Sequence, residues 1–277
     1  MGTTVPVILA HGIFRFDALR IFLRDHADVD IGPHYFNGIK DFLAQHDIPA
    51  EETDVNFAGP LELRARQLAD KVRDVLKRTG ASQVDVLAHS MGGLDARKAI
   101  VDEGLGEAIR VLTTIGTPHH GTSTADLGLR LGGRILIAGL LPVIDLKGFA
   151  DLTTGACRTF NRRANDAEAK NQVRYRTVTA TESLERTTPL LQASWVQIRA
   201  VEGESDGIVP TISQRWAERL VSTDGVTKPI QQMRFPLPAD HLNEVGVWDT
   251  GELLAGLDKR AYEDRVRDFY LTLARSA

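Results

Sequence analysis

The feature of this sequence that most restricts its fold is a serine between a short apolar run and a helix-like segment. Ala88-His89-Ser90-Met91-Gly92 ends the run Val84–Ala88 and opens the segment Gly92–Glu103. Small residues beside the serine are typical of a sharp strand-to-helix turn, because the two backbones come close together there. Such a turn holds a serine hydroxyl above the end of a sheet. The pentapeptide therefore predicts a nucleophilic serine in an α/β protein.

The rest of the chain alternates strand-like and helix-like segments. A helix is predicted where apolar residues recur at three- and four-residue steps from Leu61 to Leu76, and another where Tyr262, Val266, Phe269 and Leu273 share one face. Further strands are predicted at Val5–Ala10, Thr53–Phe57, Ile109–Ile115, Tyr175–Ala180, Trp195–Val201 and Gln231–Phe235. This order predicts a mostly parallel central sheet with helices on both faces. No repeat or linker divides residues 1–277, so we expect a single domain.

Two later loops can supply the partners that a nucleophilic serine needs. The serine requires a base, and the base requires a group that orients it. In folds with this turn the acid and the histidine follow the serine in chain order. Asp206 lies beyond the Trp195–Val201 segment, and His241 lies beyond Gln231–Phe235. We therefore predict a triad of Ser90, Asp206 and His241.

Other acids and histidines compete for these two roles. Glu202 and Glu204 are alternatives for the acid, but only Asp206 is followed by a Gly-Ile-Val-Pro turn. His119 and His120 precede Asp206, which breaks the expected order, and we interpret them as wall residues.

Two backbone N–H groups are expected to form an oxyanion hole. The Met91 N–H lies at the start of the helix after the serine, where it would point at the developing negative charge. The second donor should come from the loop after the first strand. His11-Gly12-Ile13-Phe14 fits this position, with the Ile13 N–H as the donor.

Together these motifs resemble the bacterial true lipases, the triacylglycerol lipases of the α/β-hydrolase superfamily. The Gly-Thr-Pro-His-His-Gly segment at 116–121 is more specific than the serine motif alone. The resemblance is carried by Leu9–Asp17, Tyr35–Ile39, Leu87–Arg97, Thr113–Thr122, Phe160-Asn161, Ser205–Val209 and His241–Val245.

The resemblance implies hydrolysis of carboxylic esters, favouring a triacylglycerol lipase with an acyl-enzyme on Ser90. It also implies that Asp17 and Arg64 support the oxyanion loop, and we place Phe14 and His89 beside the substrate. An esterase or polyester hydrolase with the same triad remains an alternative. So does a catalytically silent binding protein of the same fold.

A helical lid is implied after Gly121, at about residues 122–155. The segment Thr124–Phe149 is rich in leucine and isoleucine, and its glycines could act as hinges. We expect Leu140 and Leu141 to cover the acyl pocket and to meet lipid when the lid opens. The alternative is that the segment is simply core.

Composition excludes several other classes of protein and argues against bound metal. A net charge of −4 lacks the basic surface that nucleic-acid binding requires. The longest uncharged run, Ile135–Ile144, is too short to cross a bilayer, which takes about 20 apolar residues. No basic residue precedes Arg15, so we expect a cytoplasmic protein, or a secreted one if the chain is a processed form.

Relatives of the lipase type often carry a disulfide or a structural calcium ion. Cys157 is the only cysteine and cannot form an intrachain disulfide. Asn243 stands where calcium-binding relatives have an aspartate, and calcium favours carboxylate oxygens. We therefore expect no cofactor and no metal.

Overall fold

The computed structural model describes residues 5–13, 34–57, 59–130, 146–248 and 258–277. Within these residues a seven-stranded sheet has the order β2-β1-β3-β4-β5-β7-β6. The pairs from β2 through β7 are parallel, and β6 pairs with β7 antiparallel. The strands are β1 (Val7–Ala10), β2 (Ala50–Glu52), β3 (Val84–His89), β4 (Ile109–Ile115), β5 (Arg174–Thr179), β6 (Arg219–Val221) and β7 (Thr227–Arg234).

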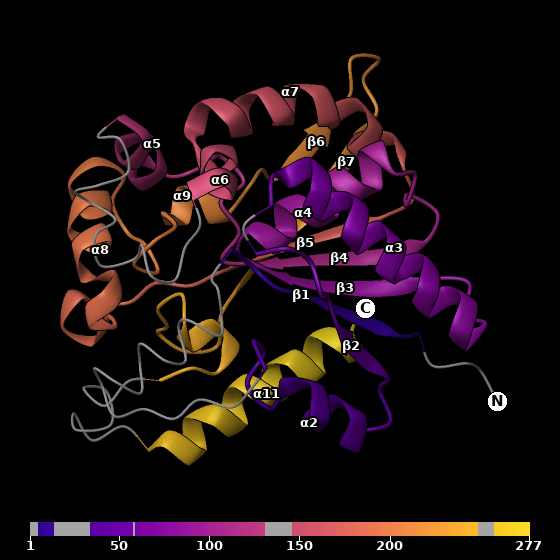
Figure 1. The fold of residues 1–277 in the computed structure, drawn as a ribbon, viewed down its shortest axis with the longest axis horizontal. Coiled ribbons are helices and arrows are strands. Elements are labelled where there is room, and N and C mark those ends of the chain that lie inside the picture. Colours follow the sequence, from indigo (N-terminus) through magenta and orange to yellow (C-terminus); the bar gives the residue numbers. More distant parts are fainter. Residues whose placement is uncertain (1–4, 14–33, 58, 131–145, 249–257) are drawn as a thin grey trace.

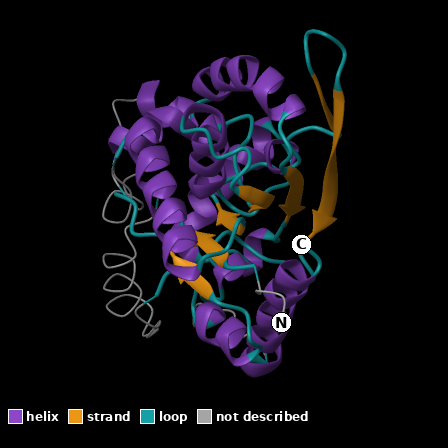
Figure 2. Ribbon diagram, turned by 90° about the vertical axis from the view of Figure 1, so that its right-hand side faces the viewer, coloured by secondary structure: helices purple, strands orange, loops and turns teal. Residues whose placement is uncertain are grey.

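Helices cover both faces of this sheet (Figure 1; Figure 2). One face carries α3 (Leu61–Thr79), α4 (Met91–Asp102) and α7 (Thr154–Lys170), and the other carries α2 (Ile39–Gln45) and α11 (Lys259–Arg275). Strand β1 shows why two layers are needed, since Val7 and Leu9 join the core beneath α2 and α11 while Ile8 and Ala10 join the core beneath α3 and α4. A strand that is apolar on both faces must be covered on both. The predicted α/β-hydrolase architecture is confirmed.

The expected helix from Leu61 to Leu76 is confirmed as α3. Its buried side chains form one stripe that includes Ala65, Leu68 and Val72. The helix ends at Gly80, whose φ of 68° lies in the left-handed region that glycine adopts without strain.

Two predicted strands are wrong. Trp195–Val201 forms the second half of α8 (Pro189–Val201), whose buried residues Leu190, Leu191, Ser194 and Ile198 follow helical spacing. The first residue of α8 is a proline, which favours a helix start. Thr53–Phe57 is a loop, and the strand before it is Ala50–Glu52.

The lid region is described only in part. Residues 123–130 form α5 (Ser123–Arg130), while α6 (Leu146–Phe149), the short helix η1 (Ala150–Leu152) and the start of α7 follow residue 145. Leu140 and Leu141 lie outside the described residues, as do Phe14 and Asp17. In the parts of the chain that are described, no helix combines the length and apolar character needed to cross a membrane.

Candidate active site

Ser90 occupies the sharp turn between β3 and α4, at the carboxyl end of the parallel strands. Its φ of 57° and ψ of −132° are unusual for a residue with a side chain. The turn is held by hydrogen bonds, because the Ser90 N–H donates to Ile115 O at 2.9 Å and the Thr117 hydroxyl donates to Ser90 O at 2.8 Å. A strained conformation that the surroundings fix in this way is typical of a nucleophile.

The glycine after Met91 allows the turn to form. A Cβ at Gly92 would lie 2.4 Å from the carbonyl oxygen of Ala10, which belongs to the backbone of β1 and cannot swing away. The helix α4 therefore passes β1 at a distance that excludes any side chain at this position. This contact explains the small residue in the motif.

The structure brings Ser90, His241 and Asp206 together from three separate segments. His241 Nε2 lies 2.8 Å from Ser90 Oγ, and His241 Nδ1 lies 2.8 Å from Asp206 Oδ2. All three side chains are buried. This is the geometry in which a histidine can take a proton from a serine while a carboxylate orients its ring.

The turn after Asp206 fixes that carboxylate. Asp206 Oδ1 accepts hydrogen bonds from the N–H groups of Ile208 at 2.9 Å and Val209 at 2.7 Å. Gly207 makes the turn possible with a φ of 97°. The Gly-Ile-Val-Pro sequence thus leaves Oδ2 directed at His241.

Glu202, His119 and His120, which compete for the roles of acid and base, form hydrogen bonds with other residues. Glu202 Oε2 accepts from the Ser123 N–H at 3.0 Å. His119 Nε2 lies 2.9 Å from the Thr114 hydroxyl, and burial together with the Arg97 charge lowers the pKa of His119 well below its usual value. His120 Nε2 contacts Trp216 O at 2.5 Å. Each of these side chains therefore has a hydrogen-bond partner outside the candidate triad.

Arg64 braces the loop that holds the proposed oxyanion donor Ile13. This fully buried guanidinium donates to Gly12 O at 3.2 Å and to His11 O at 3.1 Å, and Asp95 Oδ2 accepts from the same nitrogen at 2.6 Å. The Gly12 carbonyl and the Ile13 N–H belong to one planar trans peptide, so holding the carbonyl fixes the direction of the N–H. Met91 is the first residue of α4, beside Ser90.

His89, which we expect beside the substrate, has hydrogen-bond partners inside the protein. Its ring is fully buried, with Nδ1 2.8 Å from the Tyr35 hydroxyl and Nε2 2.9 Å from Glu244 Oε2. Both ring nitrogens are thus engaged inside the protein. Tyr35 and Glu244 were missed as site residues, and the one signal for Glu244 is its place three residues after His241.

The residues around Asn243 do not fit a calcium ion of the family type. The Asn243 side chain is used within its own loop, accepting from the Asp240 N–H at 2.9 Å and donating to Val247 O at 3.1 Å. The Asp240 carboxylate accepts from the N–H groups of Leu242, Asn243 and Thr188. These oxygens face backbone donors rather than a cation.

Three atoms close to the triad could together ligate a different metal. One atom each from His89, His241 and Glu244 lies within 4.8 Å of the other two. Two of the three donors are imidazole nitrogens, which suit zinc or copper rather than calcium. The ring nitrogens of His89 and His241 already lie within hydrogen-bonding distance of other side chains.

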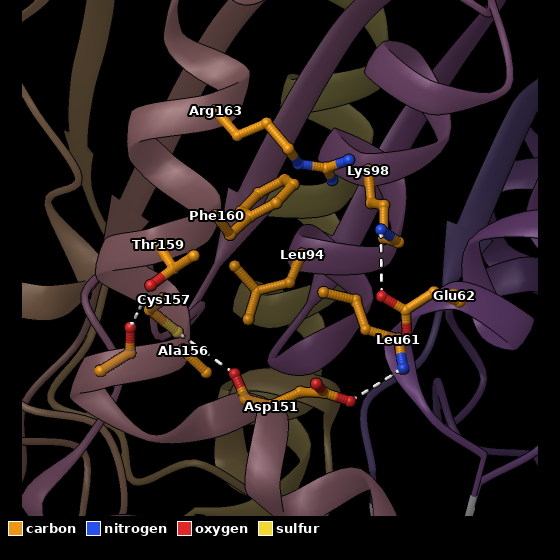
Figure 3. Close-up of a pocket in the computed structure, with 11 residues that line it drawn as sticks. Leu61, Glu62, Leu94, Lys98, Asp151, Ala156, Cys157, Thr159, Phe160 and Arg163 are labelled. Carbon is orange, nitrogen blue, oxygen red and sulfur yellow. Dashed lines mark hydrogen bonds and ion pairs between the residues drawn. The ribbon is translucent and has the colours of Figure 1, made fainter.

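A separate hollow of about 430 Å³ lies between α3, α4 and α7 (Figure 3). Leu94 and Phe160 line its apolar part, and Lys98 at its rim contacts Glu62 at 3.2 Å. The Leu61 N–H, next to Glu62, donates to Asp151 Oδ2 at 2.9 Å. No residue of the candidate triad lines this hollow, so it is distinct from the site at Ser90.

Known proteins match parts of this chain. The model of the PGAP1-like alpha/beta domain matches residues 54–128. The triacylglycerol lipase of Pseudomonas fragi is 30% identical over 126 residues, which are 46% of this chain and 39% of the relative. The triacylglycerol lipase of Vibrio cholerae is 31% identical over 153 residues, which are 52% of this chain and 45% of the relative. The chain thus matches less than half the length of these two relatives.

The solved structures extend the likeness over nearly the whole chain. The mature form of the Bacillus licheniformis lipase BlEst2 superposes with a TM-score of 0.65 at 19% identity, covering 87% of this chain and 86% of that one. The chain therefore has the α/β-hydrolase fold. Over about half of its length, its sequence is similar to bacterial triacylglycerol lipases, which confirms the resemblance.

Proposed function

We propose that this protein hydrolyses carboxylic esters in the manner of a triacylglycerol lipase, through Ser90, His241 and Asp206. The observation that carries the proposal is His241, whose two ring nitrogens lie 2.8 Å from Ser90 Oγ and 2.8 Å from Asp206 Oδ2. The names of the relatives support an ester as the substrate. A lid at about residues 122–155 and contact with a lipid interface belong to the same proposal.

The first half of the reaction forms an acyl-enzyme. His241 Nε2 takes the proton of Ser90 as Oγ attacks the ester carbonyl carbon. The resulting oxyanion accepts hydrogen bonds from the N–H groups of Met91 and Ile13. His241 then gives its proton to the alcohol oxygen, the carbon–oxygen bond of the ester breaks, and the alcohol leaves. Asp206 orients the ring and stabilises the imidazolium.

The second half repeats these steps with water. His241 takes a proton from water as the water oxygen attacks the acyl carbon, and it returns that proton to Ser90 Oγ when the acid leaves. Proton and acyl transfers balance without a further reactant. Every proton in these steps passes through His241, between Ser90 Oγ, the alcohol and water.

A series of p-nitrophenyl esters of increasing acyl length tests this function. We expect hydrolysis by the wild type and loss of it in Ser90→Ala. Preference for long acyl groups favours a lipase, and preference for short ones favours an esterase, the second candidate. Absence of hydrolysis across the series would leave the alternative of a binding protein.

A further inference from the structure

Three buried side chains beside the triad form a hydrogen-bonded chain that the proposed reaction does not use. The Tyr35 hydroxyl lies 2.8 Å from His89 Nδ1, and His89 Nε2 lies 2.9 Å from Glu244 Oε2. Tyr35 is 5% exposed, and His89 and Glu244 are 0% exposed. Buried hydrogen bonds of this kind fix the segments that they join. The second oxygen of the carboxyl, Glu244 Oε1, has no hydrogen-bond partner among the described residues.

One end of the chain lies on the loop proposed to hold the oxyanion donor. A Cβ at Gly12 would lie 2.8 Å from the Tyr35 hydroxyl oxygen and 2.6 Å from Ser90 Cβ, so the Gly12 backbone packs directly against both of these side chains. The Gly12 N–H donates to the Tyr35 oxygen. With Arg64 on the Gly12 carbonyl, Gly12 is held on both sides, and the direction of the Ile13 N–H follows.

The other end lies on the loop that carries His241. Glu244 belongs to the short helix η3 (Asn243–Val245), and its backbone carbonyl accepts from the Tyr270 hydroxyl at 3.0 Å. A Cβ at Gly116 would lie 2.2 Å from Glu244 Oε2, so the carboxyl packs directly on the backbone after β4. Its Oε2 is 3.7 Å from His241 Nδ1, which is farther than the 2.8 Å to Asp206.

His89 and Glu244, within the hydrogen-bonded network, favour their neutral forms. Burial and the neighbouring His241 lower the pKa of His89 well below its ordinary value. Burial and the nearby carboxylates of Asp206 and Asp240 raise the pKa of Glu244 well above its ordinary value. A neutral chain can fix geometry without competing with Asp206 for the imidazolium that forms during the reaction.

We propose that Tyr35, His89 and Glu244 are positioning residues that tie the histidine loop to the oxyanion loop and so direct the Ile13 N–H at the developing oxyanion. They act through the Gly12 backbone and do not touch the substrate. The inference rests on the proposed ester hydrolysis at Ser90 and adds the device that aligns its oxyanion hole.

Tyr35→Phe is the sharpest test, because it removes one oxygen and keeps the ring that packs on His11 and Phe36. With a soluble p-nitrophenyl ester we expect kcat to fall about 10- to 100-fold, because a misaligned donor acts on the transition state. KM should stay within about 2-fold. Inhibition by a trifluoromethyl ketone, which forms a tetrahedral adduct on serine, should weaken in parallel with kcat/KM.

Tyr175→Phe is the matched control. It removes the hydroxyl that accepts from Asn171 Nδ2 at 2.8 Å, near the start of β5 and thus at the end of the sheet away from Ser90. We expect its kcat and inhibitor affinity to equal those of the wild type. A loss of melting temperature that both variants share then reports packing alone.

A second pair of variants tests the hydrogen-bonded network at Glu244. Glu244→Gln keeps a neutral hydrogen-bonding group beside His89, so we expect its kcat within about 3-fold of the wild type. Glu244→Ala removes that group and should lower kcat about 10-fold or more. This pair decides the question if Tyr35→Phe does not fold.

The inference is overturned if Tyr35→Phe keeps kcat within about 2-fold of the wild type, or if Glu244→Ala and Glu244→Gln are equally active. It is also overturned if the loss in Tyr35→Phe is entirely a rise in KM. Failure of the proposed function would be seen in a different variant, as undiminished ester hydrolysis by Ser90→Ala. The two failures are therefore distinguishable.

Discussion

The two carboxylate oxygens of Asp206 have separate tasks. Oδ2 contacts His241 Nδ1 at 2.8 Å, and Oδ1 accepts the N–H groups of Ile208 and Val209. Both tasks require an acceptor, and an amide offers only one acceptor oxygen. The nearby Glu204 is exposed and lines a surface hollow with Thr211 and Arg215.

Asp206→Asn should therefore lower kcat about 10⁴-fold, because the amide favours the wrong histidine tautomer and cannot stabilise the imidazolium. Glu204→Gln is the control and should retain wild-type kcat. Hydrolysis of a soluble p-nitrophenyl ester measures both variants. An inactive Glu204→Gln beside an active Asp206→Asn would assign the acid to Glu204.

At the scale of residues, sequence motifs identified the proposed triad but not the residues proposed to align it. Ser90, Asp206 and His241 each sit in a short recognisable segment, and the structure brings them together. Tyr35 and Glu244 gain their contacts only through burial and long-range packing. The segments Tyr35–Ile39 and His241–Val245 stand out in the sequence by their resemblance to the lipases, but that resemblance does not reveal these contacts.

Among the elements, the unit formed by β3, the serine turn and α4 sets the geometry of the site. Its tightest contact is that of Gly92 with the backbone of β1, where a Cβ would lie 2.4 Å from Ala10 O. By contrast, a Cβ at Gly155, in the first turn of α7, would meet no atom within 4 Å. These two helical glycines give a matched comparison.

Gly92→Ala should destabilise the protein by about 1–3 kcal/mol or more, because backbone rather than a flexible side chain must move. Gly155→Ala should be neutral or slightly stabilising, since alanine favours a helix by about 1 kcal/mol relative to glycine. Urea unfolding measures both changes. Equal stability of the two variants would contradict the close approach of α4 to β1.

The helices and strands were predictable where one pattern was long or repeated. The stripe of α3 and the buried run of β3 are examples of such patterns. The strand expected at Trp195–Val201 proved to be part of α8, because a short apolar segment does not by itself distinguish the two structures. Only the buried residues upstream, from Leu190 onward, show the helical spacing.

For the molecule as a whole, burial of ionisable groups links stability to pH. Burial and the Arg64 charge lower the pKa of His11 to about 3. The unfolded chain therefore binds a proton here, below about pH 6.5, that the folded protein does not. Protonation of His11 in the unfolded chain therefore lowers the free energy of unfolding as the pH falls below about 6.5, and it has no effect above that pH. Burial raises the pKa of Asp240 to about 6, and that group acts in the opposite sense.

Comparison with His11→Phe isolates the histidine, because both proteins keep Asp240. From about pH 4 to about pH 6 we expect the wild type to gain about 1.4 kcal/mol per pH unit relative to the variant. Urea unfolding at several pH values measures this difference. A difference that does not change with pH would show that His11 titrates alike in both states.

The most direct test of the whole account is the mass of the protein quenched during turnover of a p-nitrophenyl ester. We expect the wild type to gain the mass of one acyl group, mapped by peptide analysis to Ser90, and Ser90→Ala to gain none. An acyl group on another residue, or its persistence in Ser90→Ala together with undiminished hydrolysis, would contradict the account.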